Sequence, residues 1–147
     1  AAQQFIDAYF AGFPRVRGFI EQTLEDGRTT GVVRTMFGRK RPVPELTSRN
    51  GQIRAAAERM AVNMPIQGTA ADILKRAMID VDRVLTAEAP TSRMILTVHD
   101  ELLFEAPAAD AERVATLVGQ TMAEGVTLSV PLDVDVGVGE NWKEAKP

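Results

Sequence analysis

The residues best suited to chemistry lie in one short stretch, LTVHDELLFEAP, at residues 96–107. It places the carboxylates of Asp100 and Glu101 directly after His99, the single histidine of the chain, between two runs of strand-forming residues. Paired carboxylates suit a hard cation, because Mg²⁺ prefers oxygen ligands, commonly one or two carboxylates with water and phosphate oxygens. The stretch therefore allows half of a magnesium site, since a two-metal centre also needs a carboxylate from another strand.

The same residues also have an ordinary structural explanation. Asp favours turns and an exposed Glu is tolerated there, so the acidic pair can be a turn and nothing more. A single histidine at a strand end suits a surface or scaffold role, and without cysteines it argues against a zinc site. As a neutral imidazole, His99 could instead donate a hydrogen bond to a sugar or base edge, which would position a substrate rather than transfer a proton.

The elements around the acidic pair are predicted to be a hairpin followed by a helix and a last strand. The hairpin strands are expected at residues 94–99 and 102–105, with Asp100 and Glu101 as the turn. Helical periodicity then runs from Pro107 to Glu124, and Gly125 is placed to stop it. Alternating Leu132, Val134, Val136 and Val138 predict a final strand.

The preceding part of the chain is predicted to be mostly helical. Apolar periodicity indicates a helix over AAQQFIDAYFAGF and a second helix from Pro14 to Gly27. The stretch TTGVVRTMFGRKRPVPEL then predicts a short hairpin with a basic tip. Helical stripes follow at residues 47–64 and from Ile73 to just before Pro90, and Pro65 should kink or break the chain between them. The fold class is α+β, a small antiparallel sheet backed by helices with a helical, basic N-terminal part.

Composition describes a globular chain with an uneven distribution of charge. The 147 residues are 45% hydrophobic, without cysteine, so a buried core is expected and a disulfide framework is excluded. No apolar run approaches the ~20 residues of a membrane span, so a soluble cytoplasmic protein is the default expectation. Between Arg28 and Arg59 eight basic residues face two acids, a net +6, which leaves −9 for the rest of a chain whose total is −3. A basic segment is ordinarily a solvated surface, so only its placement can indicate a partner.

Four ordered stretches resemble the family A (DNA polymerase I type) DNA polymerases, in their C-terminal portion. Two carry the resemblance: RAAAERMAVNMPIQGTAADILKRAM at residues 54–78, and LTVHDELLFEAP, which is similar to the palm motif commonly labelled C. TMFGRKRPVPEL and VGVGENWKEAK support it, and together the four span nearly the whole chain. The resemblance implies that residues 1–46 are the C-terminal part of the fingers and residues 47–147 a portion of the palm, within a larger polymerase domain.

Specific roles follow from the resemblance. It implies that Asp100 is a ligand of catalytic Mg²⁺ ions, that Glu101 is a nearby acid supporting the metal site, and that His99 touches the growing primer end. Asn63 and Gln67 are similar to residues that approach the minor-groove side of the terminal base pairs. The resemblance further implies that Arg59 holds a backbone phosphate and that Arg41 contacts the template strand.

The minor-groove assignment agrees with the physics of copying. Acceptors on purine N3 and pyrimidine O2 are shared by all correct base pairs, so donors there can test pair shape without reading sequence. The basic segment would add sequence-independent attraction to phosphates. The expected partners are primer–template DNA, dNTPs and the remainder of the polymerase chain, with no membrane.

Two features of the family are not found among these residues: a second palm aspartate and the nucleotide-binding helix of the fingers. The isolated chain is therefore predicted to have no polymerase activity, because phosphoryl transfer needs metals held between both carboxylates. A non-catalytic nucleic-acid-binding module is the alternative, in which the basic segment binds and the acidic turn is only a turn. A structural domain with no nucleic-acid role would require all four matches to be coincidental.

Overall fold

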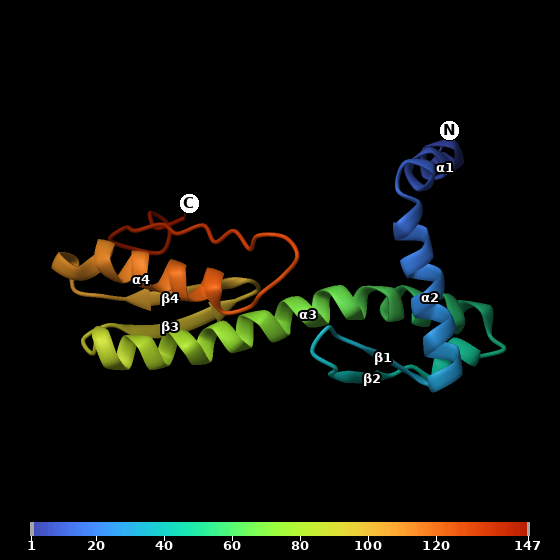
Figure 1. Ribbon diagram of the computed structural model, residues 1–147, viewed down its shortest axis with the longest axis horizontal. Helices are drawn as coiled ribbons and strands as arrows, with labels where there is room; N and C mark the ends of the chain where they lie inside the picture. The colour runs from blue at the N-terminus through green and yellow to red at the C-terminus, as the bar shows by residue number, and fades with distance from the viewer. Residues whose placement is uncertain (1, 147) are drawn as a thin grey trace. The chain divides into compact units, whose positions relative to one another are not determined.

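The computed structural model describes residues 2–146 of the chain (Figure 1). Helices and two small antiparallel sheets form two compact units, residues 1–70 and residues 71–147. This mixture confirms the α+β fold class expected from the sequence. Within residues 2–146, no helix is both long enough and apolar enough for a membrane span.

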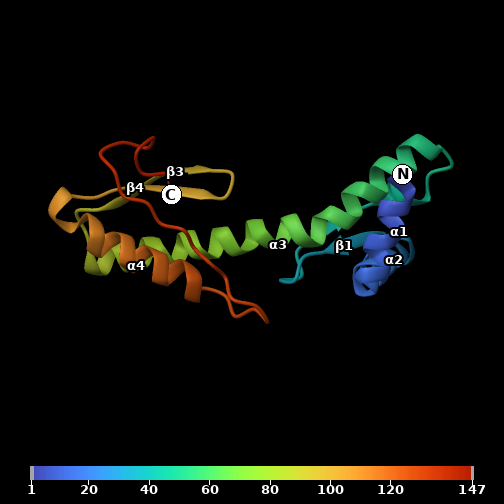
Figure 2. The ribbon, with the colours of Figure 1, turned by 90° about the horizontal axis from the view of Figure 1, so that it is seen from above.

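The first unit consists of two helices, a hairpin and the first part of a long helix. Its elements before the long helix are α1 (Ala2–Gly12), α2 (Pro14–Thr30), β1 (Val32–Arg34), β2 (Lys40–Pro42) and the 3-10 turn η1 (Pro44–Thr47). The strands pair antiparallel with Val33 opposite Arg41, and α2 lies beside β1 (Figure 2). The two helices and the basic hairpin predicted from the sequence are thereby confirmed.

The predicted end of α2 at Gly27 is wrong by one turn. Gly31 ends the helix instead, because it takes the left-handed backbone conformation, φ 72°, and its N–H bonds to the Gly27 carbonyl. Gly27 is a buried packing position inside the helix. A glycine inside a helix and one that ends it look alike in sequence, so the pattern favoured the earlier one.

The long helix α3 spans Gly51–Glu88 without interruption. Its N-terminus begins after Asn50, whose side-chain oxygen accepts hydrogen bonds from the N–H groups of Gln52 and Ile53. Pro65 lies inside the helix, so the predicted division into two helices is wrong. Proline removes one donor from the helix, but the buried Ala61 and Met64 just before it pack in the core and keep the backbone helical.

The core of the first unit lies between α3 and the hairpin region. Apolar side chains from β1, the η1 region and α3 form it, with Leu24 of α2 packed against its edge. Its buried members are Val33, Val43, Leu46, Ala57, Ala61 and Met64. The hairpin is thus fixed on the surface of α3 by burial of its apolar face.

The second unit is a hairpin backed by two helices. Its elements after α3 are β3 (Arg93–Val98), β4 (Glu101–Glu105), the 3-10 turn η2 (Ala108–Asp110) and α4 (Ala111–Glu124). The core joins Val81 and Leu85 of α3 to Val114 and Val118 of α4, with Phe104 of β4 packed on it. A small antiparallel sheet backed by helices is what the sequence predicted.

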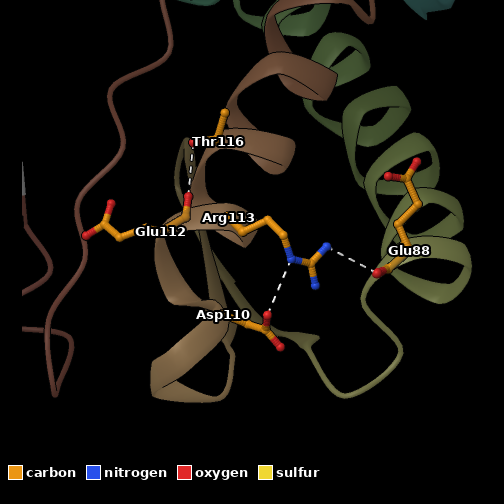
Figure 3. A network of polar contacts seen from close by, with 5 residues as sticks. All are labelled: Glu88, Asp110, Glu112, Arg113 and Thr116. Atoms are coloured by element: carbon orange, nitrogen blue, oxygen red, sulfur yellow. Dashed lines mark hydrogen bonds and ion pairs between the residues drawn. The ribbon is translucent and has the colours of Figure 1, made fainter.

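The contact between α3 and the start of α4 includes one arginine (Figure 3). Arg113 donates a hydrogen bond through Nε to Asp110 Oδ1 at 3.3 Å and another through Nη1 to the Glu88 carbonyl at 3.3 Å. Glu88 is the last residue of α3, so its carbonyl has no partner within that helix. Arg113 therefore satisfies a free helix end while fixing the first turn of α4.

The strand predicted around residues 132–138 is absent from the described structure. Residues 131–139 have no regular secondary structure, and Val136 and Val138 are each 45% exposed. The segment packs on α4, since a Cβ added to Gly119 would lie 3.0 Å from Val136 Cγ2. Alternating apolar residues form a strand only where a neighbouring strand accepts their backbone hydrogen bonds, and no such pairing exists among residues 2–146.

Candidate nucleic-acid interface and acidic turn

A hollow of about 600 Å³ lies between the hairpin and α3 in the first unit. One wall consists of residues 39–42 at β2, and the other of α3 residues Met60, Asn63, Met64, Gln67 and Gly68. Three residues predicted to bind DNA, Arg41, Asn63 and Gln67, therefore share one concave surface. Asn63 and Gln67 are four positions apart and both exposed, so they project from the same helix face.

Polar contacts at the hairpin tip set the width of this hollow. The Met36 N–H donates to Thr69 Oγ1 at 3.0 Å, and the Thr69 hydroxyl donates to the Pro65 carbonyl. Arg39 Nη2 donates to the Gly68 carbonyl at 2.9 Å. A Cβ at Gly68 would lie 2.8 Å from Thr35 Cγ2, so only glycine allows the hairpin to approach α3 this closely.

The hollow is electropositive on its β2 side. Lys40 and Arg41 are exposed and make no ion pair with any acid of the described residues. Of the two acids in the basic segment, Glu58 is paired with Arg28 at 2.8 Å, and Glu45 lies in η1 outside the lining of the hollow. Lys40 and Arg41 are thus available to an anionic partner.

Arg59 lies on a different surface from Arg41. It lines a shallower hollow of about 370 Å³ with Glu58, Val62 and two residues of α2, Ile20 and Leu24. Asn63 lines both hollows, so the two surfaces adjoin at that residue. The structure therefore places Arg59 next to Asn63, outside the hollow that contains Arg41 and Gln67.

The acidic turn of the second unit is a two-residue reversal at His99 and Asp100. Val98 pairs with Glu101, which makes Glu101 the first residue of β4 and corrects the predicted turn by one residue. His99 has φ 53°, the left-handed conformation that a two-residue hairpin requires and that histidine adopts more readily than most residues. Asp100 is exposed at the tip, and no side-chain bond involves it within residues 2–146.

Glu101 differs from Asp100 because its carboxylate has partners. Trp142 Nε1 donates to Glu101 Oε2 at 3.3 Å, and Lys146 Nζ lies 3.9 Å from Oε1. The stretch VGVGENWKEAK that contains both partners was noted in the sequence only as a supporting match, with no role. Nothing local in the sequence links residues 41 positions apart, so this contact was missed.

Metal-binding capacity within residues 2–146 is limited. No group of three or more His, Cys, Asp or Glu side chains is arranged to hold an ion there. The acidic turn offers the Asp100 carboxylate, with Glu101 beside it already engaged.

Comparison with known proteins identifies the family. Residues 1–144 match the model of DNA polymerase family A. The chain belongs to this family. The match extends over both units and includes three of the four stretches in full and the fourth, residues 136–146, as far as Glu144. The family assignment made from the sequence is therefore confirmed.

Relatives of the family A chain are bacterial enzymes. It is 54% identical to the thermostable DNA polymerase I of Thermus aquaticus and to DNA polymerase I of Deinococcus radiodurans, each over 145 residues and 99% of the chain. It spans only 17% and 15% of those two proteins. A solved structure described as the POL domain of Pol1 from M. smegmatis in complex with DNA primer-template and dNTP matches with a TM-score of 0.93 and 44% identity, covering 98% of this chain and 25% of that one.

Proposed function

We propose that this chain is the fingers-and-palm portion of a template-directed DNA polymerase that transfers deoxynucleotides from dNTPs to a primer 3′ end. In this proposal residues 1–46 belong to the fingers and residues 47–147 to the palm. The relatives are DNA polymerases, and the M. smegmatis neighbour is described with primer-template and dNTP bound. The protein would act with the remainder of a polymerase chain in the cytoplasm, in DNA replication or repair.

The hollow between β2 and α3 is the observation that carries the proposal. It brings the cation of Arg41 within one concave surface with the amides of Asn63 and Gln67. Cations bind phosphates whatever the sequence, while amide donors suit the acceptors that all base pairs present in the minor groove. We propose that Arg41 contacts the template backbone, that Arg59 holds a phosphate beside Asn63, and that His99 approaches the primer end.

We propose that Asp100 provides the carboxylate for Mg²⁺. The donor set fits a hard cation because this carboxylate is exposed, lies in a two-residue turn and has no bonded partner among the described residues. Bound Mg²⁺ would neutralise phosphate charge during two-metal phosphoryl transfer. Glu101 supports the turn, and a second aspartate would come from polypeptide outside residues 1–147. The isolated chain would then be inactive in synthesis.

Replacing the corresponding segment of a related family A polymerase with residues 1–147 tests this function. The graft should extend a primer, and Asp100→Ala should reduce extension by at least about 1,000-fold, as expected when charge stabilisation in the transition state is lost. Binding to primer–template should stay measurable. Asp82→Ala, which changes an exposed acid on α3 with no side-chain partner among the described residues, is the matched control. A folded but inactive graft, or near-normal extension by Asp100→Ala, would contradict the proposal.

A non-catalytic nucleic-acid-binding module is the second candidate, favoured by the exposed Lys40 and Arg41 at the hollow. It predicts that charge reversal of Arg39, Lys40 and Arg41 removes most DNA binding by the 147-residue chain. It also predicts that Mg²⁺ has no effect beyond ionic strength. An active graft that depends on Asp100 would exclude this candidate.

A further inference from the structure

Residues 139–146 form a turn that folds back on itself. A Cβ at Gly139 would lie 2.7 Å from the backbone N of Ala145 and 2.7 Å from the carbonyl carbon of Glu144, so any side chain there would prevent the turn from closing. The Asn141 carbonyl accepts hydrogen bonds from the N–H groups of Glu144 and Ala145, each at 3.0 Å. The Asn141 side chain donates through Nδ2 to Glu144 Oε1 at 2.7 Å and accepts through Oδ1 from the Glu144 N–H at 3.2 Å. The turn is therefore internally fixed.

This turn brings two donors to the acidic hairpin. The indole N–H of Trp142 and the ammonium of Lys146 face different oxygens of Glu101, at 3.3 and 3.9 Å. The adjacent Asp100 makes no such contact within residues 2–146. Two neighbouring carboxylates are thereby given different environments, one held and one free.

We propose that Trp142 and Lys146 are positioning residues that hold the Glu101 carboxylate, so that Asp100 alone is presented as the metal ligand of the hairpin. This inference rests on the proposed polymerase function. Glu101 would then connect the hairpin to the 139–146 turn and would not itself coordinate the cation.

The exposure of these groups indicates what the contact can do. The side chains of Lys146 and Glu101 are 62% and 47% exposed, and an ion pair in that position contributes little to folding stability. A fixed direction for the carboxylate matters more, because a displacement of about 1 Å in a reacting assembly is enough to slow a reaction. Loss of the contact should therefore change activity more than the melting temperature.

The contact can be observed directly in the 147-residue chain. One tryptophan gives one indole N–H resonance in a ¹H–¹⁵N spectrum. Glu101→Ala should shift this resonance and make its proton exchange faster, whereas Glu101→Gln, which keeps an acceptor, should have a smaller effect. Glu105→Ala, at the other exposed end of the same strand, is the control. An indole resonance that is unchanged by Glu101→Ala would overturn the inference.

Its functional consequence can be measured in the grafted polymerase. Trp142→Phe keeps a ring but lacks the donor, and Lys146→Met keeps length but lacks the charge. Each should lower kcat by about 2- to 10-fold, the range of one hydrogen bond, and raise the Mg²⁺ concentration for half-maximal rate. KM for dNTP and the melting temperature should not change, and Lys146→Arg should restore the rate.

The two proposals fail in distinguishable ways. If Asp100→Ala abolishes extension while Trp142→Phe and Lys146→Met keep the parent kcat and Mg²⁺ dependence, the positioning role is wrong and the polymerase function stands. If Asp100→Ala remains active, the proposed metal ligand itself is wrong. A fall in rate that accompanies an equal loss of folded protein in both variants would assign the turn a purely structural role and overturn the inference.

Discussion

Gly27 lies where α2 packs against η1, and its missing side chain leaves room for Leu46. A Cβ there would be 2.7 Å from Leu46 Cδ1 and 3.3 Å from Val33 Cγ1. Leu46 is 1% exposed and Val33 4%, so neither can move into solvent without opening the core. The close approach of α2 to the hairpin region therefore requires a residue without a side chain at position 27.

Gly27→Ala should lower the free energy of unfolding by about 1–2 kcal/mol, because overpacking exceeds the gain in helix propensity. Gly18→Ala is the matched control in the same helix, since a Cβ there meets nothing within 4 Å. That variant should instead gain about 0.5–1 kcal/mol from propensity. Urea unfolding of both variants measures the difference, and equal changes would show that Leu46 does not constrain the helix.

At the scale of elements, the tip of the hairpin and the proline of α3 are connected by one hydroxyl. Thr69 is 6% exposed, accepts a hydrogen bond from the Met36 N–H and donates to the Pro65 carbonyl. Thr69 therefore satisfies the Met36 N–H of the hairpin and also bonds to the backbone carbonyl of Pro65 in α3. Together with the bond from Arg39 to the Gly68 carbonyl, this connection holds the hairpin against α3 beside the hollow that contains Arg41 and Gln67.

Thr69→Val should destabilise the chain by about 1–3 kcal/mol, because it leaves the Met36 N–H without a partner in a part-buried position. Thr86→Val is the matched control, since Thr86 is exposed and its hydroxyl, among residues 2–146, bonds only to the Asp82 carbonyl of the same helix. That change should stay within about 0.5 kcal/mol. Thermal unfolding compares the two, and a Thr69→Val variant as stable as Thr86→Val would contradict the connection.

Periodicity predicted most elements because helices and hairpins leave local signals. The helical stripes, the basic hairpin and the strands around His99 are all visible in the order of apolar residues. Three features depended on distant partners and could not be predicted in this way. Pro65 remains helical because the core holds its neighbours. Among residues 2–146, residues 132–138 have no strand to pair with. Gly27 is needed inside α2 because Leu46 occupies the space that a side chain would take.

The candidate site was predictable to a similar degree. The family resemblance indicated Arg41, Asn63 and Gln67, and the structure brings these three to one hollow. The contact of Trp142 and Lys146 with Glu101 was not predictable, because it depends on a turn closed by Gly139. Local patterns locate chemical groups, whereas tertiary packing decides which of them share a surface.

At the scale of the whole molecule, charge segregation would let an acidic chain bind the proposed DNA partner. Residues 28–59 carry a net +6 within a total of −3. Attraction to phosphates acts over roughly 10 Å at moderate ionic strength, so a local excess of cations matters more than the sum. Lys40 and Arg41 lie exposed at the hollow, while most acids lie outside the basic segment.

Salt dependence of DNA binding should report this segregation. For each phosphate contact, the slope of log K against log salt falls by about 0.9 on duplex DNA. Arg41→Gln should therefore make the slope shallower by about that amount for binding of the 147-residue chain to a labelled primer–template, measured by fluorescence anisotropy at several KCl concentrations. Arg83→Gln removes the same charge outside the basic segment, at an exposed pair with Asp80, and should leave the slope unchanged. Equal slopes for the parent and Arg41→Gln would show that Arg41 touches no phosphate. An equal loss in Arg83→Gln would show that binding follows total charge, with no preferred surface.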